Sequence, residues 1–367
     1  MLFVDAMSSA IWLEEKLCIK ATQKRLPLGG SLELLPLCNM NCAMCYVRLS
    51  REEMERKGRI RSAGEWLDLA SYMKKQGVLF LLLTGGEPLL YPEFKELYLR
   101  LLDMGFIITI NSNGTLMDKA WADFFAGHRP RRINITLYGK DGATYKNLCH
   151  YEEGFERTIY GIKLLRERNV DVKLNGSITK FNKDDLGELI RIANELDVPI
   201  SIDTYMYPAA RERDCGFCEN ARLEAGEAGK AKVKAAQLLL NEEKFEEYRC
   251  QMLLKGNQEV GEGSDCSVRC RAGRSSFVVN WQGLMTPCIM LQEPCVNVFN
   301  QGFEESWEYM VEEIEKIRVS SRCASCRRRN VCPTCAACAL LETGSYDQVP
   351  KYLCDYTEAM FKELERS

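Results

Sequence analysis

The first two-thirds of the chain alternates short apolar segments, rich in β-branched residues, with longer amphipathic segments. The apolar segments predict strands at 32–35, 78–83, 106–110, 133–138, 170–178 and 200–205. The amphipathic segments predict helices at 63–76, 92–104, 118–126, 153–168 and 183–196. Strands that alternate with helices pair in parallel through right-handed crossovers. The pattern therefore predicts an α/β fold, either an open doubly wound sheet or a partial barrel, with its chemistry at the carboxyl ends of the strands.

The alternation ends near residue 210. A polar stretch rich in Ala, Glu and Lys follows, and it predicts a linker with one long helix at 230–254. Beyond residue 264 cysteines become frequent, with a strand expected at 276–279 and a helix at 303–317. We therefore expect four parts: an N-terminal extension (1–30), the α/β core (31–210), the linker and helix (211–263) and a cysteine-rich α+β domain (264–367).

Composition narrows the class of protein. With 49 Lys and Arg against 52 Asp and Glu, the net charge of −3 argues against a nucleic-acid partner. No segment approaches the roughly 18 apolar residues of a membrane span, and residues 1–25 lack the apolar centre of a signal peptide. We therefore expect a cytoplasmic protein without a membrane partner. In that compartment cysteines stay reduced, and clustered cysteines indicate metal or redox chemistry. The chain has 18 cysteines but only 2 histidines, so thiolates are the expected metal ligands.

A CxxxCxxC motif, formed by Cys38, Cys42 and Cys45, follows the first predicted strand. Three thiolates on one loop can hold three irons of a [4Fe–4S] cluster, which usually takes four cysteines. One iron then keeps an open position, which is typical of a catalytic metal site. The alternative is a three-cysteine zinc site completed by a distant ligand. However, no histidine lies near the motif, and its spacing differs from the usual CxxC knuckles.

With Tyr46 directly after it, this motif resembles the defining motif of the radical S-adenosylmethionine (SAM) enzymes. The resemblance covers about residues 31–207 and implies a partial (β/α)6 barrel. It implies that the open iron chelates the amino and carboxylate groups of SAM, and that an electron then cleaves SAM to a 5′-deoxyadenosyl radical. A flavodoxin or ferredoxin is the reductant that the resemblance implies.

The turn after the second predicted strand contains Gly85, Gly86, Glu87 and Pro88. Paired glycines permit close backbone approach, and Glu87 offers an acceptor for a cationic amine. A Gly-Gly-Glu sequence alone is more often a plain turn. In this position it resembles the site at which the family binds the SAM amine.

Three further polar residues match the family less closely. Asn113, in the sequence Asn-Ser-Asn-Gly after the third strand, resembles the family's "TNG" turn. Thr136 and Asn175 occupy strand positions from which family members often contact the ribose or carboxylate of SAM. Turn chemistry or ordinary strand polarity is the alternative for each. Sulfatase-modifying members carry an Arg after the fourth strand, and residues 145–150 contain none.

The C-terminal cysteines resemble the seven-cysteine SPASM pattern, CX9-15GX4C, CX2CX5CX3C and C, over about residues 266–358, with one residue fewer in the last short gap. By this resemblance one auxiliary [4Fe–4S] cluster is bound by Cys323, Cys326, Cys332 and Cys354. The other is bound by Cys270, Cys288, Cys335 and Cys266. Cys338 competes for the place of Cys335, and Cys295 for that of Cys266. A zinc ribbon at Cys323, Cys326, Cys332 and Cys335 would leave Cys270, Cys288 and Cys354 unexplained.

The substrates that the SPASM resemblance implies are peptides or proteins. We expect a radical SAM oxidoreductase with SAM and three [4Fe–4S] clusters that crosslinks, oxidises or epimerises a peptide, as in ribosomal peptide natural products. Only about 30 residues precede the first strand, so we expect that a peptide-recognition domain is absent or supplied by another protein. Cys215 and Cys218 form a CxxC in the polar linker, and we expect that pair to be incidental.

Three alternatives stay open. One is a radical SAM enzyme that acts on a small molecule or tetrapyrrole. Another is an anaerobic sulfatase maturase, but those enzymes place an acidic residue beside the equivalent of Cys288, where this chain has Ile289. The most distant is a non-catalytic iron–sulfur or zinc protein, which has no need of an open iron. No general acid or base is identified, although Asp203, Tyr205 and Tyr207 are placed to reach the predicted cavity.

Overall fold

One continuous sheet organises the chain, whose computed structural model describes residues 9–208, 211, 221–258 and 265–367. Its strand order is β6-β5-β4-β3-β2-β1-β7-β8-β9. The strands from β6 to β7 pair in parallel, and β8 and β9 add antiparallel at one edge. The strands are β1 Gly29–Glu33, β2 Phe80–Thr84, β3 Ile107–Ser112, β4 Arg132–Thr136, β5 Val172–Ser177, β6 Ile200–Asp203, β7 Ser276–Val279, β8 Leu284–Thr286 and β9 Val296–Asn297. The predicted α/β fold with a parallel sheet is confirmed.

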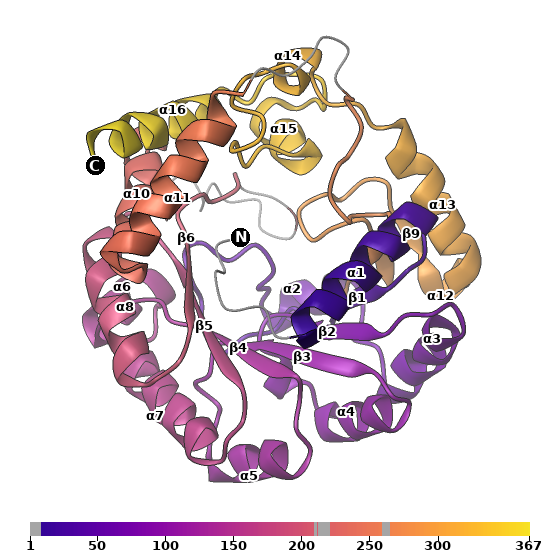
Figure 1. Cartoon of the computed structure of the whole chain (residues 1–367). Helices are drawn as coiled ribbons and strands as arrows, with labels where there is room; N and C mark the ends of the chain where they lie inside the picture. Colours follow the sequence, from indigo (N-terminus) through magenta and orange to yellow (C-terminus); the bar gives the residue numbers. More distant parts are fainter. Residues whose placement is uncertain (1–8, 209–210, 212–220, 259–264) are drawn as a thin grey trace.

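An arc of helices covers the outer face of the sheet (Figure 1). These helices are α3 Ala63–Lys75, α4 Phe94–Asp103, α5 Lys119–Gly127, α7 Gly154–Glu167 and α8 Leu186–Glu195. Each turns an apolar stripe toward the strands, and one buried cluster joins Trp66 and Phe94 of the helices to Leu32 and Ile110 of the sheet. Because strand side chains alternate between faces, the neighbouring positions Ser31 and Asn111 point to the inner face. The barrel therefore has an apolar outer wall and a partly polar interior.

Within residues 9–208, three helices were not anticipated from the sequence, namely α1 Ser9–Lys24, α2 Arg51–Lys57 and α6 Gly142–Cys149. The single long helix expected at 230–254 is wrong. The segment forms α10 Ala225–Leu239 and α11 Glu242–Gly256 instead. The break occurs at Asn241, whose side chain accepts a hydrogen bond from the backbone N–H of Lys244 and so starts a new helix.

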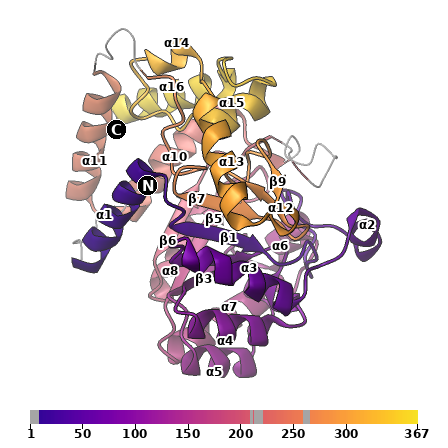
Figure 2. The same ribbon diagram turned by 90° about the vertical axis from the view of Figure 1, so that its right-hand side faces the viewer.

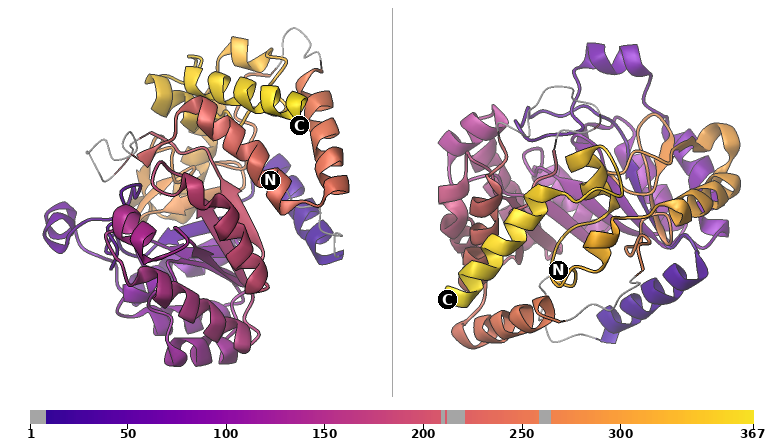
Figure 3. Two further views of the ribbon diagram at one scale, coloured as in Figure 1. Left: turned by 90° about the vertical axis from the view of Figure 1, so that its left-hand side faces the viewer. Right: turned by 90° about the horizontal axis from the view of Figure 1, so that it is seen from above.

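The cysteine-rich segment continues the barrel rather than standing apart from it. Its strand β7 pairs with β1, so the sheet crosses the boundary expected near residue 264. Helix α16 lies along α10 (Figure 3), where a Cβ atom at Gly229 would lie 2.2 Å from the carbonyl oxygen of Tyr356. The remaining elements are η1 Pro88–Leu90, η2 Lys183–Asp185, α12 Val298–Gln301, α13 Phe303–Lys316, α14 Ser321–Ala324, α15 Ala336–Thr343 and α16 Lys351–Arg366.

The two ends of the strands are covered by different elements. Figure 2 shows β1 running from the side of α1 toward the side of α2. Helix α1 is attached at the amino ends, where Thr22 Oγ1 lies 2.7 Å from Ser275 Oγ and the Trp307 indole donates to the carbonyl of Arg25. The CxxxCxxC loop lies at the opposite, carboxyl ends. Among the described helices, none has the length and apolarity that crossing a membrane requires.

Candidate functional site

The cysteine loop is fixed against the turn that follows β2. The N–H of Gly86 donates to Leu35 O at 2.8 Å, and the N–H of Glu87 donates to Leu37 O at 2.9 Å. A Cβ atom at Gly85 would lie 2.4 Å from Leu35 O, and one at Gly86 would lie 2.2 Å from Leu37 O. Since real Cβ atoms do not approach backbone so closely, only glycine fits at either position. The two loops therefore meet as closely as the paired glycines led us to expect.

The three thiols of the motif share one small site at the carboxyl end of the barrel. Cys38 Sγ accepts from the N–H of Met40 at 3.4 Å, and Cys45 Sγ accepts from the N–H of Arg48 at 3.3 Å. Burial, together with the charges of Glu87, Cys42 and Cys45, raises the pKa of Cys38 to about 12. All three side chains belong to one packed cluster with Met40 and Tyr145.

Their spacing does not suit a single bound ion. In the described ranges, no three His, Cys, Asp or Glu side chains converge on one metal position. A cuboidal cluster holds each thiolate on a different iron, so its ligands lie farther apart than those of one ion. The donor set of three thiols with backbone N–H groups directed at two of the sulfurs fits such a cluster.

Glu87 is fully buried, and its carboxylate joins two turns. Its Oε1 accepts from Ser112 Oγ at 2.9 Å and from the N–H of Leu89 at 3.2 Å, while Oε2 accepts from the N–H of Asn113 at 2.8 Å. Burial raises its pKa to about 7. These bonds tie the Gly-Gly-Glu-Pro turn to the turn after β3, so Glu87 has a positioning role. Its contact with the SAM amine stays a prediction.

Asn113 links the turn after β3 to the cysteine loop. Its Nδ2 donates to Asn39 Oδ1 at 2.9 Å and contacts Cys38 Sγ at 3.6 Å. Its Oδ1 accepts from the N–H and the hydroxyl of Thr115 at 2.9 and 2.6 Å. The Asn113 side chain therefore fixes the position of Cys38 relative to the turn that contains Glu87.

We expect Asn113→Ala to lower the free energy of unfolding by roughly 1–3 kcal/mol, because Asn39 and Thr115 lose buried partners. It should also speed iron loss from the reconstituted protein several-fold, measured with an iron chelator under anaerobic conditions. Asn182→Ala is the matched control, because Asn182 is a buried asparagine bonded to Thr179 and to Tyr138 O. Equal iron loss in the two variants would contradict this role for Asn113.

Thr136 and Asn175 lie side by side, as register partners at the ends of β4 and β5. The region after β4 that lacks an arginine forms α6, which sequence reasoning missed. Its end supports the cysteine loop, because the N–H of Asn41 donates to Cys149 O at 3.0 Å and that of Ala43 to Leu148 O at 2.8 Å. The only sequence signal for α6 is its N-cap, Asp141.

Two buried side chains that bear opposite charges also escaped sequence reasoning. Arg211 donates from both Nη atoms to the two carboxylate oxygens of Glu33, each at 2.6 Å. The side chains are 2% and 0% exposed, respectively. The guanidinium lies 5.5 Å from the centre of the Tyr46 ring. The pair therefore joins the end of β1 to the segment beyond β6, beside the aromatic residue of the motif. The available sequence signal was Glu33, the last residue of β1, which is flanked by Leu32 and Leu34.

The C-terminal cysteines influence one another within two groups, and their division between two clusters stays a prediction. Burial and then the charges of Cys335 and Cys270 raise the pKa of Cys288. Burial and then the charges of Cys354, Cys332 and Cys326 raise the pKa of Cys323 to about 11. The first group is thus Cys270, Cys288 and Cys335, and the second is Cys323, Cys326, Cys332 and Cys354.

Cys338 lies beside its competitor Cys335, whereas Cys295 and Cys266 have different neighbours. Cys338 is buried in the first turn of α15, with its Sγ 3.4 Å from that of Cys335. Cys295 lies beside Glu293, whose charge raises its pKa after the effect of burial. Cys266 accepts a backbone hydrogen bond from the N–H of Val319 at 2.8 Å. Cys215 and Cys218 lie outside the described residues.

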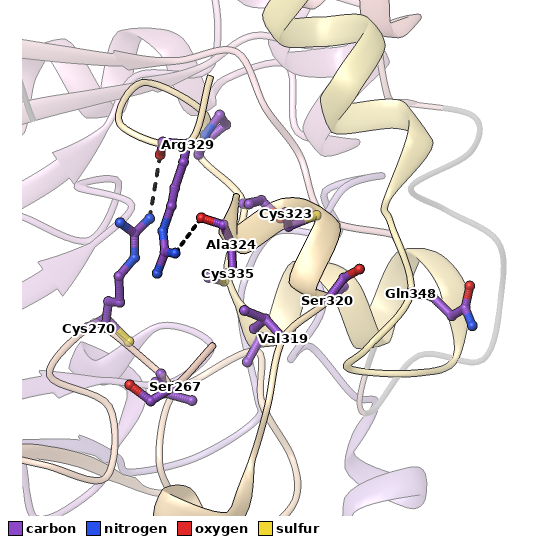
Figure 4. Close-up of a pocket in the computed structure, with 15 residues that line it drawn as sticks. Ser267, Cys270, Val319, Ser320, Cys323, Ala324, Arg329, Cys335 and Gln348 are labelled. Carbon is purple, nitrogen blue, oxygen red and sulfur yellow. Dashed lines mark hydrogen bonds between the residues drawn. The ribbon is translucent and has the colours of Figure 1, made fainter. Parts of the chain in front are cut away.

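A cavity of about 370 Å³ is lined by cysteines of both C-terminal groups (Figure 4). Cys270 and Cys335 belong to the first group, and Cys323 belongs to the second. Arg329 and Arg269 also line it. Arg329 is 8% exposed, and its guanidinium donates to the backbone carbonyls of Ala324 and Asp265. A buried cation needs negative charge nearby. A [4Fe–4S] core with four thiolates has a net negative charge, so this wall fits such a group.

A second cavity, of about 540 Å³, occupies the barrel interior. At the carboxyl ends of the strands its wall includes Tyr46 of the cysteine loop and Cys288 of the first C-terminal group. At the amino ends its wall includes Arg131 and Arg271. We call this space the barrel cavity. Its wall thus includes the residue next to Cys45 and one cysteine of the first C-terminal group.

Comparison with known proteins agrees with this geometry. A family model described as the radical SAM superfamily matches residues 32–196, so this part of the chain is a radical SAM domain. An AdoMet-dependent heme synthase of Methanosarcina barkeri is 24% identical over 342 residues, which are 88% of this chain and 95% of that protein. The subtilosin biosynthesis protein AlbA of Bacillus subtilis is 21% identical over 91% of this chain and 72% of its own length.

Solved structures share the fold beyond the matched domain. Streptococcus suis SuiB bound to S-adenosylmethionine superposes with a TM-score of 0.64 at 17% identity, covering 96% of this chain and 82% of that one. The anSMEcpe structure with bound AdoMet and Cp18Cys peptide gives a TM-score of 0.70 at 17% identity, covering 93% and 97%. The likeness thus includes the C-terminal cysteine-rich part.

Proposed function

We propose that the chain is a radical SAM oxidoreductase in which Cys38, Cys42 and Cys45 hold a [4Fe–4S] cluster with one open iron. When SAM is bound there, the cluster supplies the electron that cleaves SAM to a 5′-deoxyadenosyl radical, which abstracts hydrogen from the substrate. The observation that carries the proposal is the barrel cavity, which contacts Tyr46 beside the cysteine loop at one point and Cys288 at another. A substrate held there is within reach of both sites.

The chain's own residues position SAM and the cluster. Gly85 and Gly86 let the turn before Pro88 pack on the cysteine loop, and Glu87 and Asn113 keep that turn in register with Cys38. We propose the Gly85–Pro88 turn, with Glu87, for the SAM amine. We propose Thr136 and Asn175 for the ribose or carboxylate, since they lie together at neighbouring strand ends.

We propose two auxiliary [4Fe–4S] clusters, each bound by one of the two groups of C-terminal cysteines. One is held by Cys323, Cys326, Cys332 and Cys354, and the other by Cys270, Cys288 and Cys335 with Cys266. Arg269 and Arg329 would stabilise the negative charge of such clusters. The SAM-binding cluster at Cys38, Cys42 and Cys45 needs a low-potential reductant. We therefore propose a flavodoxin or ferredoxin as the electron donor.

The substrate class favoured here is a small carboxylate-bearing tetrapyrrole. The volume of the barrel cavity falls in the range of small-molecule sites, roughly 300–1,000 Å³. The relatives matched over 95% and 91% of their own length are named heme synthases. A peptide, the class we expected from the SPASM resemblance, is the second candidate, since the AlbA relative is a bacteriocin biosynthesis protein and two of the structures sharing this fold contain a peptide.

The substrate class is tested by turnover of SAM. We expect an iron porphyrin with propionate side chains to raise 5′-deoxyadenosine formation by reduced, reconstituted protein at least tenfold above the substrate-free rate. Arg-, Glu- and Cys-containing peptides should leave that rate unchanged. Stimulation by peptides alone would replace the tetrapyrrole by a peptide substrate and leave the radical SAM assignment intact.

A further inference from the structure

Resting on the proposed function, we propose that Arg131 and Arg271 bind carboxylate groups of the substrate at the amino end of the barrel cavity. The ligand that this arrangement recognises has an apolar body and at least one carboxylate at its edge. The residues that carry the inference lie at the end of the barrel opposite the cysteine loop, where the sequence motifs give no indication of a site.

The two arginines come from separate segments and meet on one helix. Arg131 directly precedes β4, whereas Arg271 lies in the loop before β7. Helix α1 contacts both, since Glu14 pairs with Arg131 and the Cys18 sulfur accepts from Arg271. Residues four apart on a helix face the same way, with Cβ atoms about 5–6 Å apart. The two guanidinium groups therefore reach the same short stretch of α1, close enough to act on one ligand.

The charge at this end of the cavity favours an anion. Among the residues that line the barrel cavity, Arg131 and Arg271 are the cationic side chains and Glu14 is the acidic one. Glu14 binds Arg131 through both oxygens, at 2.9 and 2.5 Å, so a carboxylate already fits this guanidinium in bidentate geometry. The side chains are 42% and 31% exposed. Because such a pair contributes only about 0–1 kcal/mol, a ligand carboxylate can replace Glu14 at little cost.

The wall between the two ends has an apolar part beside the polar side chains of Thr109 and Asn111. Phe80, Leu82 and Ile289 line the cavity, and the Arg131 guanidinium lies 5.5 Å from the centre of the Phe80 ring. Along β1, the four residue steps from Gly29 to Glu33 span about 13 Å. A ligand anchored at the arginines must therefore have a body of about this length to reach Tyr46 and Cys288, with an apolar face toward Phe80 and Ile289.

The test is equilibrium dialysis of the reconstituted holoprotein against a free-base porphyrin with propionate side chains, with the bound porphyrin measured by its absorbance. We expect Arg131→Gln and Arg271→Gln each to raise the Kd at least tenfold. Glu14→Gln should lower it two- to fivefold, since it removes the competing carboxylate. Arg129→Gln is the matched control, because Arg129 is an exposed arginine of the same loop outside the cavity wall, and it should leave the Kd unchanged.

Two comparison ligands test whether a carboxylate is recognised and whether a porphyrin or a peptide carries it. The methyl ester of the same porphyrin should bind at least tenfold more weakly than the acid and equally well to wild type and arginine variants. If a glutamate-rich peptide binds in place of the porphyrin, and the same arginine variants weaken it, the carboxylate site stands and the tetrapyrrole proposal falls. Equal affinity for acid and ester, or unchanged affinity in both arginine variants, would overturn the inference. SAM cleavage by the wild type without substrate is unaffected by those results and tests the proposed function separately.

Discussion

Replacing Cys42 by alanine is expected to reduce 5′-deoxyadenosine formation to the level without enzyme. The radical SAM site has only three cysteines, so losing one leaves too few thiolates to hold a cluster with a single open iron. The iron content of the reconstituted protein should fall from about 12 to about 8 per chain, because two clusters with four irons each remain. Iron analysis and chromatographic detection of 5′-deoxyadenosine measure the two effects.

Cys149→Ala provides the matched control. Cys149 is as deeply buried as Cys42 and belongs to the same small apolar cluster, which also contains Met40 and Tyr145. Its variant should keep about 12 irons and near-normal SAM cleavage. A Cys42→Ala protein with normal SAM cleavage, or a Cys149→Ala protein that loses its cluster, would contradict the proposed ligand set.

Removing Glu33 is expected to lower the free energy of unfolding by about 3–5 kcal/mol. The Glu33→Ala variant leaves the guanidinium of Arg211 buried beneath Tyr46 without its carboxylate, and uncompensated buried charges have costs of this size. Urea-induced unfolding of the cluster-free protein measures the effect. Asp171→Ala, which removes the carboxylate from the exposed Arg132–Asp171 pair, should cost less than about 1 kcal/mol.

The double variant Glu33→Leu/Arg211→Leu separates charge from packing. Replacing both members of a buried ion pair by apolar residues is often neutral. We therefore expect the double variant to be more stable than Glu33→Ala alone. If the effects of Glu33→Ala and Arg211→Ala simply add, the two side chains act independently and the pair does not join β1 to the segment beyond β6.

Most strands of the sheet were predictable because each is marked by a short apolar segment of its own. The strands from β2 to β6 fall on the predicted apolar segments, whereas β1 begins at Gly29, three residues before the predicted 32–35; Ser276–Val279 was also expected. The pairing of β7 with β1 was not predictable, because it joins segments more than 240 residues apart, Gly29–Glu33 and Ser276–Val279. Helix α6 was missed because it is only eight residues long. The predicted long helix failed at Asn241, where a capping side chain outweighed a helix-favouring composition.

The candidate site also contains residues that the sequence predicts and residues that only the fold reveals. Cys38, Cys42 and Cys45 stand on one loop, so their spacing is visible in the sequence. The roles inferred for Glu33, Arg211, Arg131 and Arg271 depend on contacts between distant segments. Glu87 belongs to a motif that is visible in the sequence, but its hydrogen bonds to another turn are visible only in the fold. Its sequence indicates an acceptor, whereas the fold shows both of its oxygens already bonded to Leu89, Ser112 and Asn113.

The most direct test is whether anaerobically reconstituted protein converts SAM to 5′-deoxyadenosine with dithionite as reductant. We predict formation of 5′-deoxyadenosine by the wild-type protein and none above background by Cys42→Ala. A wild-type protein that contains its clusters and yields no 5′-deoxyadenosine, with or without porphyrin or peptide, would contradict the assignment as a radical SAM enzyme.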